Sequence, residues 1–324
     1  MSKRLGKKIW IDDNPDREKT AKELGYEFVN VWKGDLQATV ENLLTGNERK
    51  QVVLDHVLDK TATTNPVFRR GSTIAEAIKE AWPFCPVIGV TTGMTQLKRV
   101  DQRTKHTYDA FFPYDGLSDY LDQIDSIEKG FASIANSVPS DSNDIIALLK
   151  PPDIERKRLV EALPHDLKKW KDRSVASRLH SWVNQLLNRP GFLYDGLSAA
   201  TFLGLNKSGL AKVEKTFHRA KYSGVFSVDS NPRWWAVMLT EQLYKQLSPR
   251  PGEFSWNVGR RLDGITRRFY SECYACDDET PPDTVAYLDS ESDERQPMHL
   301  KHTVLHPGYK RELFFEDIRM MKDD

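Results

Sequence analysis

The sequence predicts a mixed α/β protein in three parts: a doubly wound parallel sheet, a mainly helical region and a small C-terminal α+β element. Over residues 1–134, short apolar runs alternate with segments of helical spacing. This alternation is typical of a parallel sheet covered by helices on both faces. After residue 153 the apolar residues recur at helical spacing instead. Beyond residue 272 the chain becomes acidic and contains short strand-like runs.

Length and composition support several folded domains. The chain has 324 residues, of which 39% are hydrophobic, enough for well-packed cores. Residues 135–153 are rich in Ser, Asn, Asp and Pro, a composition typical of a connector. We therefore expect an α/β domain over 1–134, a linker over 135–153, a helical output domain over 154–272 and an acidic element over 273–324.

The composition also bears on the compartment. No apolar run approaches the roughly 20 residues that a membrane-spanning helix needs. The basic N-terminus, MSKRLGKK, is not followed by the apolar stretch of a secretory signal. The three cysteines do not suggest a disulfide framework. We expect a cytoplasmic protein with no membrane partner.

Acidic and hydroxyl side chains come directly after three of the strands expected in the N-terminal part. Strands are expected over 8–11, 26–31, 51–54, 86–90 and 108–112, and helices over 15–24, 36–44 and 73–81. Asp12 and Asp13 follow the first strand, Asp55 the third and Thr91 the fourth. The carboxyl ends of parallel strands form the functional edge of such sheets, so we expect these four residues to lie together.

Three clustered carboxylates repel one another and favour a hard divalent cation such as Mg²⁺. A carboxylate bound to that ion can attack a phosphoryl group while the metal offsets the charge. The arrangement resembles the receiver domain of bacterial response regulators over roughly residues 6–130, which implies a flavodoxin-like fold. The resemblance further implies phosphorylation of Asp55, an acidic metal pocket of Asp12, Asp13 and Asp55, and a hydroxyl role for Thr91.

One position departs from the receiver pattern. The family has a Lys directly before the Pro that follows the last strand, whereas this sequence has Phe112 before Pro113. A phenyl ring cannot contact a phosphoryl oxygen as an ammonium group does. Two interpretations are therefore open: a switch that depends on phosphorylation, or a pseudo-receiver that docks a protein or dimerises.

Residues 198–216, SAATFLGLNKSGLAKVEKT, have the spacing of two short helices joined by a tight turn. Ala200 provides the small residue needed where two helices cross, and Gly204 tolerates a left-handed turn. The segment resembles the helix-turn-helix of bacterial DNA-binding regulators, and a β-hairpin expected over 222–235 would make the domain winged-helix-like. The second helix of such a domain contacts DNA. The residues expected to do so are Lys207, Ser208, Lys212, Lys215, Arg219, Lys221 and Arg233.

The distribution of charge supports a polyanionic partner. The whole chain has 47 Lys and Arg and 47 Asp and Glu, so its net charge is zero. Residues 151–272 nevertheless hold 21 basic against 12 acidic side chains, and residues 273–324 hold 6 against 13. The helical region is therefore a candidate for binding nucleic acid, and the acidic end is a candidate inhibitor of that binding.

Two cysteines and two histidines in close pairs suggest a second metal site. Cys273 and Cys276 are followed by His299 and His302, and two Cys with two His can complete a tetrahedral Zn²⁺ site. A fully extended strand through 299–305 would instead point the two histidines to opposite faces. The alternative is a pair of half-buried thiols near surface histidines.

These patterns predict DNA binding by the helical domain under the control of the receiver-like domain. The alternative is a pseudo-receiver adaptor in bacterial signalling or defence, which assembles a complex with a kinase, an ATPase or a second copy of the chain. The motifs GxxxxGK[ST], GxGxxG, GxSxG and HExxH do not occur, so no catalytic residue is expected. A metal-dependent phosphatase or nuclease that uses the three aspartates, with His56 as a base, is the enzymatic alternative.

Overall fold

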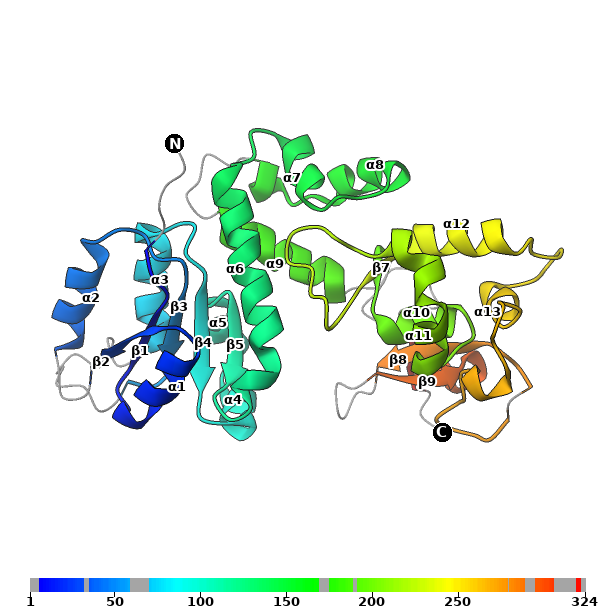
Figure 1. The fold of residues 1–324 in the computed structure, drawn as a ribbon, viewed down its shortest axis with the longest axis horizontal. Coiled ribbons are helices and arrows are strands. Elements are labelled where there is room, and N and C mark those ends of the chain that lie inside the picture. The colour runs from blue at the N-terminus through cyan, green and yellow to red at the C-terminus, as the bar shows by residue number, and fades with distance from the viewer. Residues whose placement is uncertain are drawn as a thin grey trace. The chain divides into compact units, whose positions relative to one another are not determined.

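The computed structural model of the chain describes residues 6–31, 35–58, 70–168, 175–188, 191–278, 280–288, 295–305 and 319–321. Contacts divide the chain into two compact units. Unit 1 comprises Met1–Leu148 and Leu163–Val183, and unit 2 comprises Leu149–Ala162 and Asn184–Asp324. In Figure 1 the sheet of unit 1 is blue to cyan, and the hairpin near the C-terminus of unit 2 is orange.

Unit 1 is built on a five-stranded sheet in which neighbouring strands are parallel. The strands are β1 (Ile9–Asp12), β2 (Glu27–Asn30), β3 (Val52–Asp55), β4 (Val87–Thr91) and β5 (Ala110–Pro113). Their order is β2-β1-β3-β4-β5. This order confirms the expected parallel sheet and is compatible with a flavodoxin-like receiver fold.

Helices lie on both faces of this sheet, and Figure 1 shows α1 in front of it and α3 behind it. The helices are α1 (Glu18–Glu23), α2 (Leu36–Leu44), α3 (Gly71–Ala81), α4 (Met94–Arg99), α5 (Gln102–His106), α6 (Leu121–Asn136) and α7 (Ser142–Leu148), with 3-10 turns at Pro15–Arg17, Leu117–Tyr120 and His165–Lys168. The helix α9 (Val175–Asn188) begins in unit 1 and ends in unit 2.

The central strands β1, β3 and β4 of unit 1 are buried on both faces. Ile9 and Ile11 of β1 belong to one core cluster with Ile74 and Ile78 of α3, and all four are buried. Trp10 lies between the two isoleucines, so it points to the opposite face, and it is equally buried. Coverage of both faces explains why these strands are continuous apolar runs rather than alternating ones.

The segment expected to be a linker, 135–153, instead contains helix α7, which belongs to unit 1. The Asp144 carboxylate accepts from the Ser140 amide at 2.8 Å, and the Asp144 amide donates to Asp141 Oδ1 at 2.9 Å. Ile145 and Ile146 are buried. The Ser and Asp residues that suggested a loop are therefore the residues that cap this helix.

A buried histidine gives unit 1 a pH dependence. His180 of α9 is 3% exposed, and its ring centroid lies 6.0 Å from that of Phe131. Burial lowers the pKa of His180 to about 4, in spite of Asp109, which raises it. In the unfolded chain the pKa is about 6.5, so stability is fully present above that pH and is lost as the pH falls from 6.5 towards 4. The loss amounts to at most about 1.4 kcal/mol per pH unit.

We expect the free energy of unfolding of a His180→Gln variant to fall less than that of the wild type between about pH 6.5 and pH 4.5. Urea unfolding at several pH values measures this difference. His106→Gln, which changes an exposed histidine, is the matched control and should keep the wild-type slope. If the free energy of unfolding depended on pH equally in all three proteins, the pKa of His180 would not be lowered in the folded state.

Unit 2 is mainly helical around one apolar core. Its elements up to residue 269 are α8 (Asp153–Ala162), β6 (Leu193–Tyr194), α10 (Gly196–Phe202), α11 (Lys207–Val213), the 3-10 segment η5 (Glu214–Ala220), β7 (Trp234–Trp235), α12 (Ala236–Gln246), α13 (Ser255–Gly259) and η6 (Arg267–Phe269). The core includes Leu203 directly after α10, Leu210 of α11 and Leu239 of α12.

The β-hairpin expected over 222–235 is not formed, so the prediction of a wing there is wrong. β7 pairs antiparallel with β6, and an isolated bridge joins Lys221 to Trp234. Tyr222 and Phe226 are buried, and Phe226 adopts a φ of 65°. These residues turn inward to the core, so the apolar runs that suggested two strands belong to a compact loop.

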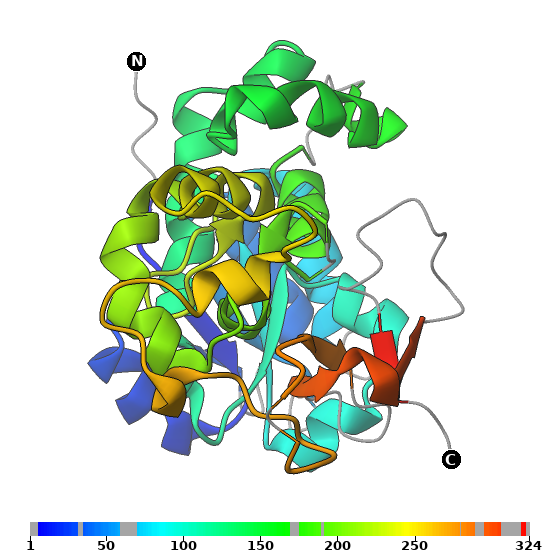
Figure 2. The same cartoon turned by 90° about the vertical axis from the view of Figure 1, so that its right-hand side faces the viewer.

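A small sheet follows the helices of unit 2. Its strands are β8 (Thr284–Leu288), β9 (Arg295–His299), β10 (Thr303–Leu305) and β11 (Arg319–Met321), in the order β10-β11-β8-β9, with the 3-10 turn η7 (Leu300–His302). Figure 2 draws these strands in orange and red. Arg295 of β9 donates to Asp195, the residue that caps α10, at 2.8 Å. This bond ties the hairpin of β8 and β9 to α10.

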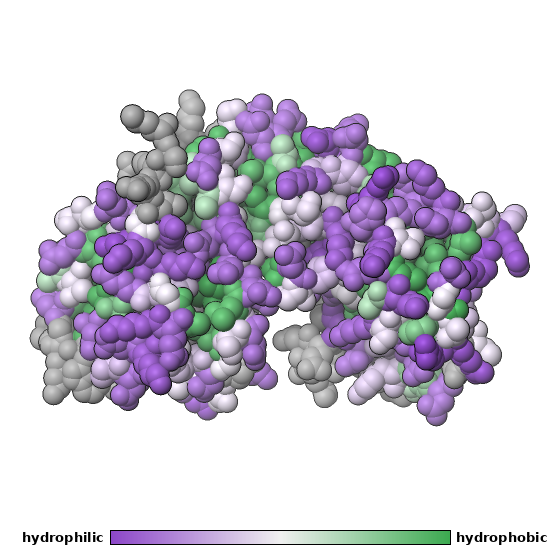
Figure 3. All heavy atoms as spheres, in the orientation of Figure 1, coloured by the Kyte–Doolittle hydropathy of each residue, from purple (hydrophilic) through white to green (hydrophobic). Residues whose placement is uncertain are grey.

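The face drawn in Figure 3 is mostly hydrophilic, and hydrophobic residues appear on it in small patches. Large exposed hydrophobic side chains among the described residues include Ile154, Phe254 and Tyr274. Within the described ranges, no helix is both long and apolar enough to cross a bilayer.

Candidate functional site

The acidic residues expected at the edge of the sheet lie together. Carboxylate oxygens of Asp12, Asp13 and Asp55 lie within 4.8 Å of one another, and the three side chains are buried. Thr91, at the end of β4, is buried as well. The clustering follows from the sheet order, because Asp12 and Asp55 are the last residues of the paired strands β1 and β3.

Arg17, a residue that the sequence did not point to, reaches into this cluster. Its Nη1 donates to Asp12 Oδ2 at 2.9 Å and lies 3.2 Å from Asp55 Oδ2. The Arg17 side chain is 8% exposed, and its guanidinium carbon lies 4.5 Å from the centre of the Tyr114 ring. A positive charge of the protein itself therefore sits between two of the three carboxylates.

The turn after β1 explains this placement. The Asn14 side chain accepts from the Asp16 amide at 3.1 Å, and Pro15 fixes the first position of the turn Pro15–Arg17. Asp12 accepts from the Asn14 amide at 2.7 Å, which holds the turn against the end of β1. The side chain of Arg17 is thereby directed back over the strand. The sequence gives only a slight indication of this contact, namely one Arg a few residues after an acidic pair.

The electrostatics of the cluster follow from burial and from these contacts. Burial raises the pKa of Asp55, and Asp12 raises it further, while Arg17 partly opposes both. The pKa of Arg17 is raised, because Asp55 and Asp12 outweigh the effect of its own burial. Mg²⁺ requires a near-octahedral set of oxygen ligands. Two of the candidate oxygens already contact a guanidinium that would repel the ion, so the residues as arranged do not fit Mg²⁺.

Phe112 and His56, which the sequence places near this cluster, make contacts with aromatic side chains. Phe112, in the place of the receiver Lys, is buried, and its ring centroid lies 4.8 Å from that of Tyr120. Nδ1 of His56 shares a hydrogen bond with the Tyr108 hydroxyl at 3.2 Å, and its ring lies against Phe111. Burial lowers the pKa of His56, and Arg70 lowers it further. His56 is therefore in contact with Tyr108 and Phe111.

In unit 2, α10 and α11 form the expected pair of helices with a tight turn. Ala200 of α10 is fully buried, and Gly204 in the turn has a φ of 67°. A Cβ on Gly204 would lie 2.5 Å from the carbonyl oxygen of Trp256, so a side chain is excluded on two grounds. Asn206 caps α11 by accepting from the Gly209 amide at 2.8 Å. The turn agrees with the sequence prediction.

The two sides of α11 and η5 differ sharply in burial. Leu210, Val213 and Phe217 are buried in the core of unit 2. The expected DNA contacts Lys207, Ser208, Lys212, Lys215 and Arg219 are exposed. The outward side of this segment is therefore polar and mainly basic.

Two arginines outside the predicted set of DNA contacts lie next to this side. The Asn206 amide donates to the Phe269 carbonyl at 2.9 Å, and its side chain donates to the Arg268 carbonyl at 3.0 Å. These bonds place η6 against the start of α11, and Arg267 and Arg268 are both exposed. We use the name "α11 surface" for Lys207, Lys212, Lys215, Arg219, Arg267 and Arg268.

The other two expected DNA contacts are engaged within unit 2. The Lys221 ammonium pairs with Glu214. Arg233 is 17% exposed, and its Nη1 lies 3.7 Å from Asp195 Oδ2. Burial alone would raise the pKa of Asp195, but Arg295, the Ser198 amide and Arg233 outweigh it and lower that pKa. Arg233 thus balances the charge of the residue that caps α10.

The C-terminal cluster brings together three of the four residues expected to bind zinc. Ligand atoms of Cys273, Cys276 and His302 lie within 4.8 Å of one another. His299 is engaged elsewhere: its Nδ1 lies 2.8 Å from Asp283 Oδ1, and its Nε2 lies 2.6 Å from the Asp278 carbonyl oxygen. The 3-10 turn η7 breaks the strand after His299, so the simple alternation expected for 299–305 does not apply.

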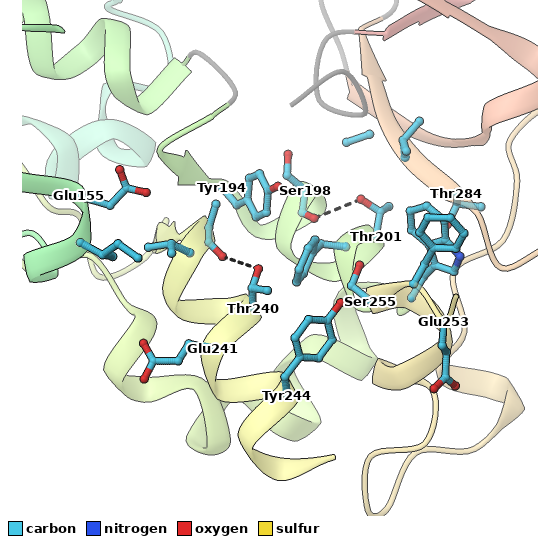
Figure 4. Close-up of a pocket in the computed structure, with 18 of the residues that line it drawn as sticks. Glu155, Tyr194, Ser198, Thr201, Thr240, Glu241, Tyr244, Glu253, Ser255 and Thr284 are labelled. Carbon is cyan, nitrogen blue, oxygen red and sulfur yellow. Dashed lines mark hydrogen bonds between the residues drawn. The ribbon is translucent and has the colours of Figure 1, made fainter. Parts of the chain in front are cut away.

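Unit 2 also contains a cavity of about 710 Å³ that the sequence did not indicate. Figure 4 labels hydroxyl side chains and carboxylates on its wall: Tyr194, Ser198, Thr201, Thr240, Tyr244, Ser255, Thr284, Glu155, Glu241 and Glu253. Thr284 is buried, and its hydroxyl has no hydrogen-bond partner within the part of the chain that the structure describes. The volume is typical of sites for small molecules. Two of the carboxylates are paired with arginines, Glu155 with Arg158 of the wall and Glu253 with Arg261.

No protein-family model matches the chain, and no curated protein shows significant similarity to it.

Proposed function

We propose that the chain binds DNA through the α11 surface of unit 2, and that unit 1 docks a protein rather than acting as a phosphorylation switch. The observation that carries the first part is the two-sided character of α11. One side is fixed in the core by Leu210 and Val213, and the other presents Lys207, Lys212 and Lys215 to solvent. A short helix held across its partner by a tight turn is the arrangement that places a helix in a major groove.

The surroundings of α11 support a phosphate-binding role. Arg267 and Arg268 of η6 add positive charge beside the start of the helix. Glu214 follows α11 directly, and it is paired with Lys221. Contacts between basic side chains and phosphates provide most of the affinity of non-specific DNA binding.

The proposal for unit 1 rests on Arg17. Phosphorylation of Asp55 with a bound divalent ion would require Arg17 to leave Asp12 and Asp55, to which it lies within 3.2 Å. Phe112 offers no ammonium to stabilise a phosphoryl group there. A pseudo-receiver that docks a protein such as a kinase or an ATPase, or a second copy of the chain, is consistent with both observations. If unit 2 fails to bind DNA, an adaptor is the function that we propose in its place.

The test is the salt dependence of DNA binding by the full chain. Fluorescence anisotropy with labelled duplexes of mixed sequence should give an affinity that falls steeply between about 50 and 200 mM salt. We expect a Lys212→Ala/Lys215→Ala variant to bind all sequences more weakly and to lose about two from the slope of log K against log salt. Lys245→Ala, at an exposed position on α12, is the matched control and should change neither quantity. The absence of binding at low salt would refute the proposal and favour the adaptor.

A further inference from the structure

The loop that follows η6 holds two thiols close to a histidine of η7. Sγ of Cys276 lies 3.3 Å from Nε2 of His302, and Sγ of Cys273 completes a set of ligand atoms within 4.8 Å of one another. In a tetrahedral zinc site, Zn–S bonds of about 2.3 Å and Zn–N bonds of about 2.0 Å separate the ligand atoms by roughly 3.5–3.8 Å. The three atoms are therefore already near the spacing that one ion imposes.

Backbone contacts hold this loop in place. The His299 amide donates to Cys273 Sγ at 3.3 Å, and the Tyr274 amide donates to the Pro297 carbonyl at 2.8 Å. Both bonds join the loop to β9, so the two cysteines are fixed relative to the strand that leads to His302.

His299 supports the site without belonging to it. Its side chain is buried, and both of its ring nitrogens are used, one by Asp283 and the other by the Asp278 carbonyl. These contacts hold Asp278 and Asp283 against β9. His299 is therefore a positioning residue, and its replacement should not remove a ligand atom.

We infer that Cys273, Cys276 and His302 bind one Zn²⁺ ion, which fastens the loop 271–278 to η7. Two soft thiolates and one imidazole are a ligand set that selects zinc over hard cations such as Mg²⁺. Three protein ligands leave one coordination position for water. Cys273 lines a cavity of about 680 Å³ together with Asn206 and Lys207, which gives an ion a path to the site.

Metal analysis of the purified full chain tests this inference. We expect about one zinc ion per chain in the wild type and less than about a tenth of that in Cys273→Ser, Cys276→Ser and His302→Gln. Cys85→Ala and His218→Gln are the matched controls for a cysteine and a histidine outside the site, and His299→Gln should also retain zinc. Circular dichroism identifies any variant that fails to fold.

Substitution with Co²⁺ keeps the test decisive if a variant is unstable. The wild type should show the intense visible bands of a tetrahedral cobalt site and thiolate charge-transfer absorption, and each cysteine variant should lose about half of the latter. Three results would overturn the inference: wild-type protein without zinc after loading, zinc that persists in all three ligand variants, or a disulfide between Cys273 and Cys276 in freshly purified protein.

Discussion

Replacement of Arg17 with Ala is expected to lower the free energy of unfolding of unit 1 by about 3–5 kcal/mol. The variant leaves Asp12 and Asp55 buried near each other without the guanidinium that contacts both. Removing one partner of a buried ion pair costs more than the pair contributes, because the remaining charge has no water to solvate it. Urea unfolding followed by circular dichroism measures the effect.

Two further variants show whether charge is the cause. Arg99→Ala removes an exposed arginine of α4 and should change stability by less than about 0.5 kcal/mol. The double variant Arg17→Ala/Asp55→Asn should regain much of the free energy of unfolding that Arg17→Ala loses, since it also removes one of the two facing carboxylates. Millimolar Mg²⁺ should stabilise Arg17→Ala but not the wild type, because the ion can then occupy the position of the guanidinium. A wild type that is stabilised by Mg²⁺ as strongly as the variant would contradict the pseudo-receiver interpretation.

Replacement of Gly204 or Gly259 with Ala is expected to destabilise unit 2 by about 3 kcal/mol or more. Gly204 has a φ of 67°, and a Cβ there would lie 2.5 Å from the Trp256 carbonyl oxygen. A Cβ on Gly259 would lie 2.2 Å from the Leu203 carbonyl oxygen. In both cases the added Cβ meets a backbone carbonyl oxygen, so no side-chain rotation relieves the clash and the turn must move away from α13.

The chain offers a control that separates strain from crowding. Gly252 has a φ of 76°, and a Cβ there would meet no atom within 4 Å. Gly252→Ala should therefore lower the free energy of unfolding by only about 1 kcal/mol, the cost of placing a residue with a Cβ in the left-handed backbone conformation. If Gly252→Ala proved as harmful as Gly204→Ala, the close contact of the turn with α13 would not be the main reason for glycine at 204. DNA affinity should fall with Gly204→Ala and stay unchanged with Gly252→Ala.

The parts of the fold that depend on local pattern were predictable. Asp12 and Asp55 follow buried strands, and parallel strands bring such ends together, so their clustering could be inferred before the structure was known. The turn at Gly204 was equally clear, because few residues tolerate that backbone conformation. The exposed side of α11 followed from the spacing of its apolar residues.

The features that the sequence did not predict depend on contacts between residues that are far apart along the chain. Arg17 approaches Asp55 because β1 pairs with β3, a strand about 40 residues later in the sequence. The apolar runs around Tyr222 suit a hairpin as well as an inward-turned loop, and only the competing pairing of β6 with β7 decides between them. The cavity of unit 2 collects side chains from α8, α10, α12 and β8, and no local pattern indicates such a set.

Trp256 belongs to two features of unit 2 at once. It lines the cavity, where its ring stacks on that of Phe254 with centroids 4.8 Å apart, and its carbonyl oxygen lies directly beneath Gly204. A molecule that shifted this residue on entering the cavity would also shift the turn that orients α11. The cavity and the turn before α11 therefore share one residue. If the proposed DNA binding holds, any factor by which a cavity ligand changed the affinity for DNA would equal the factor by which DNA changed the affinity for that ligand.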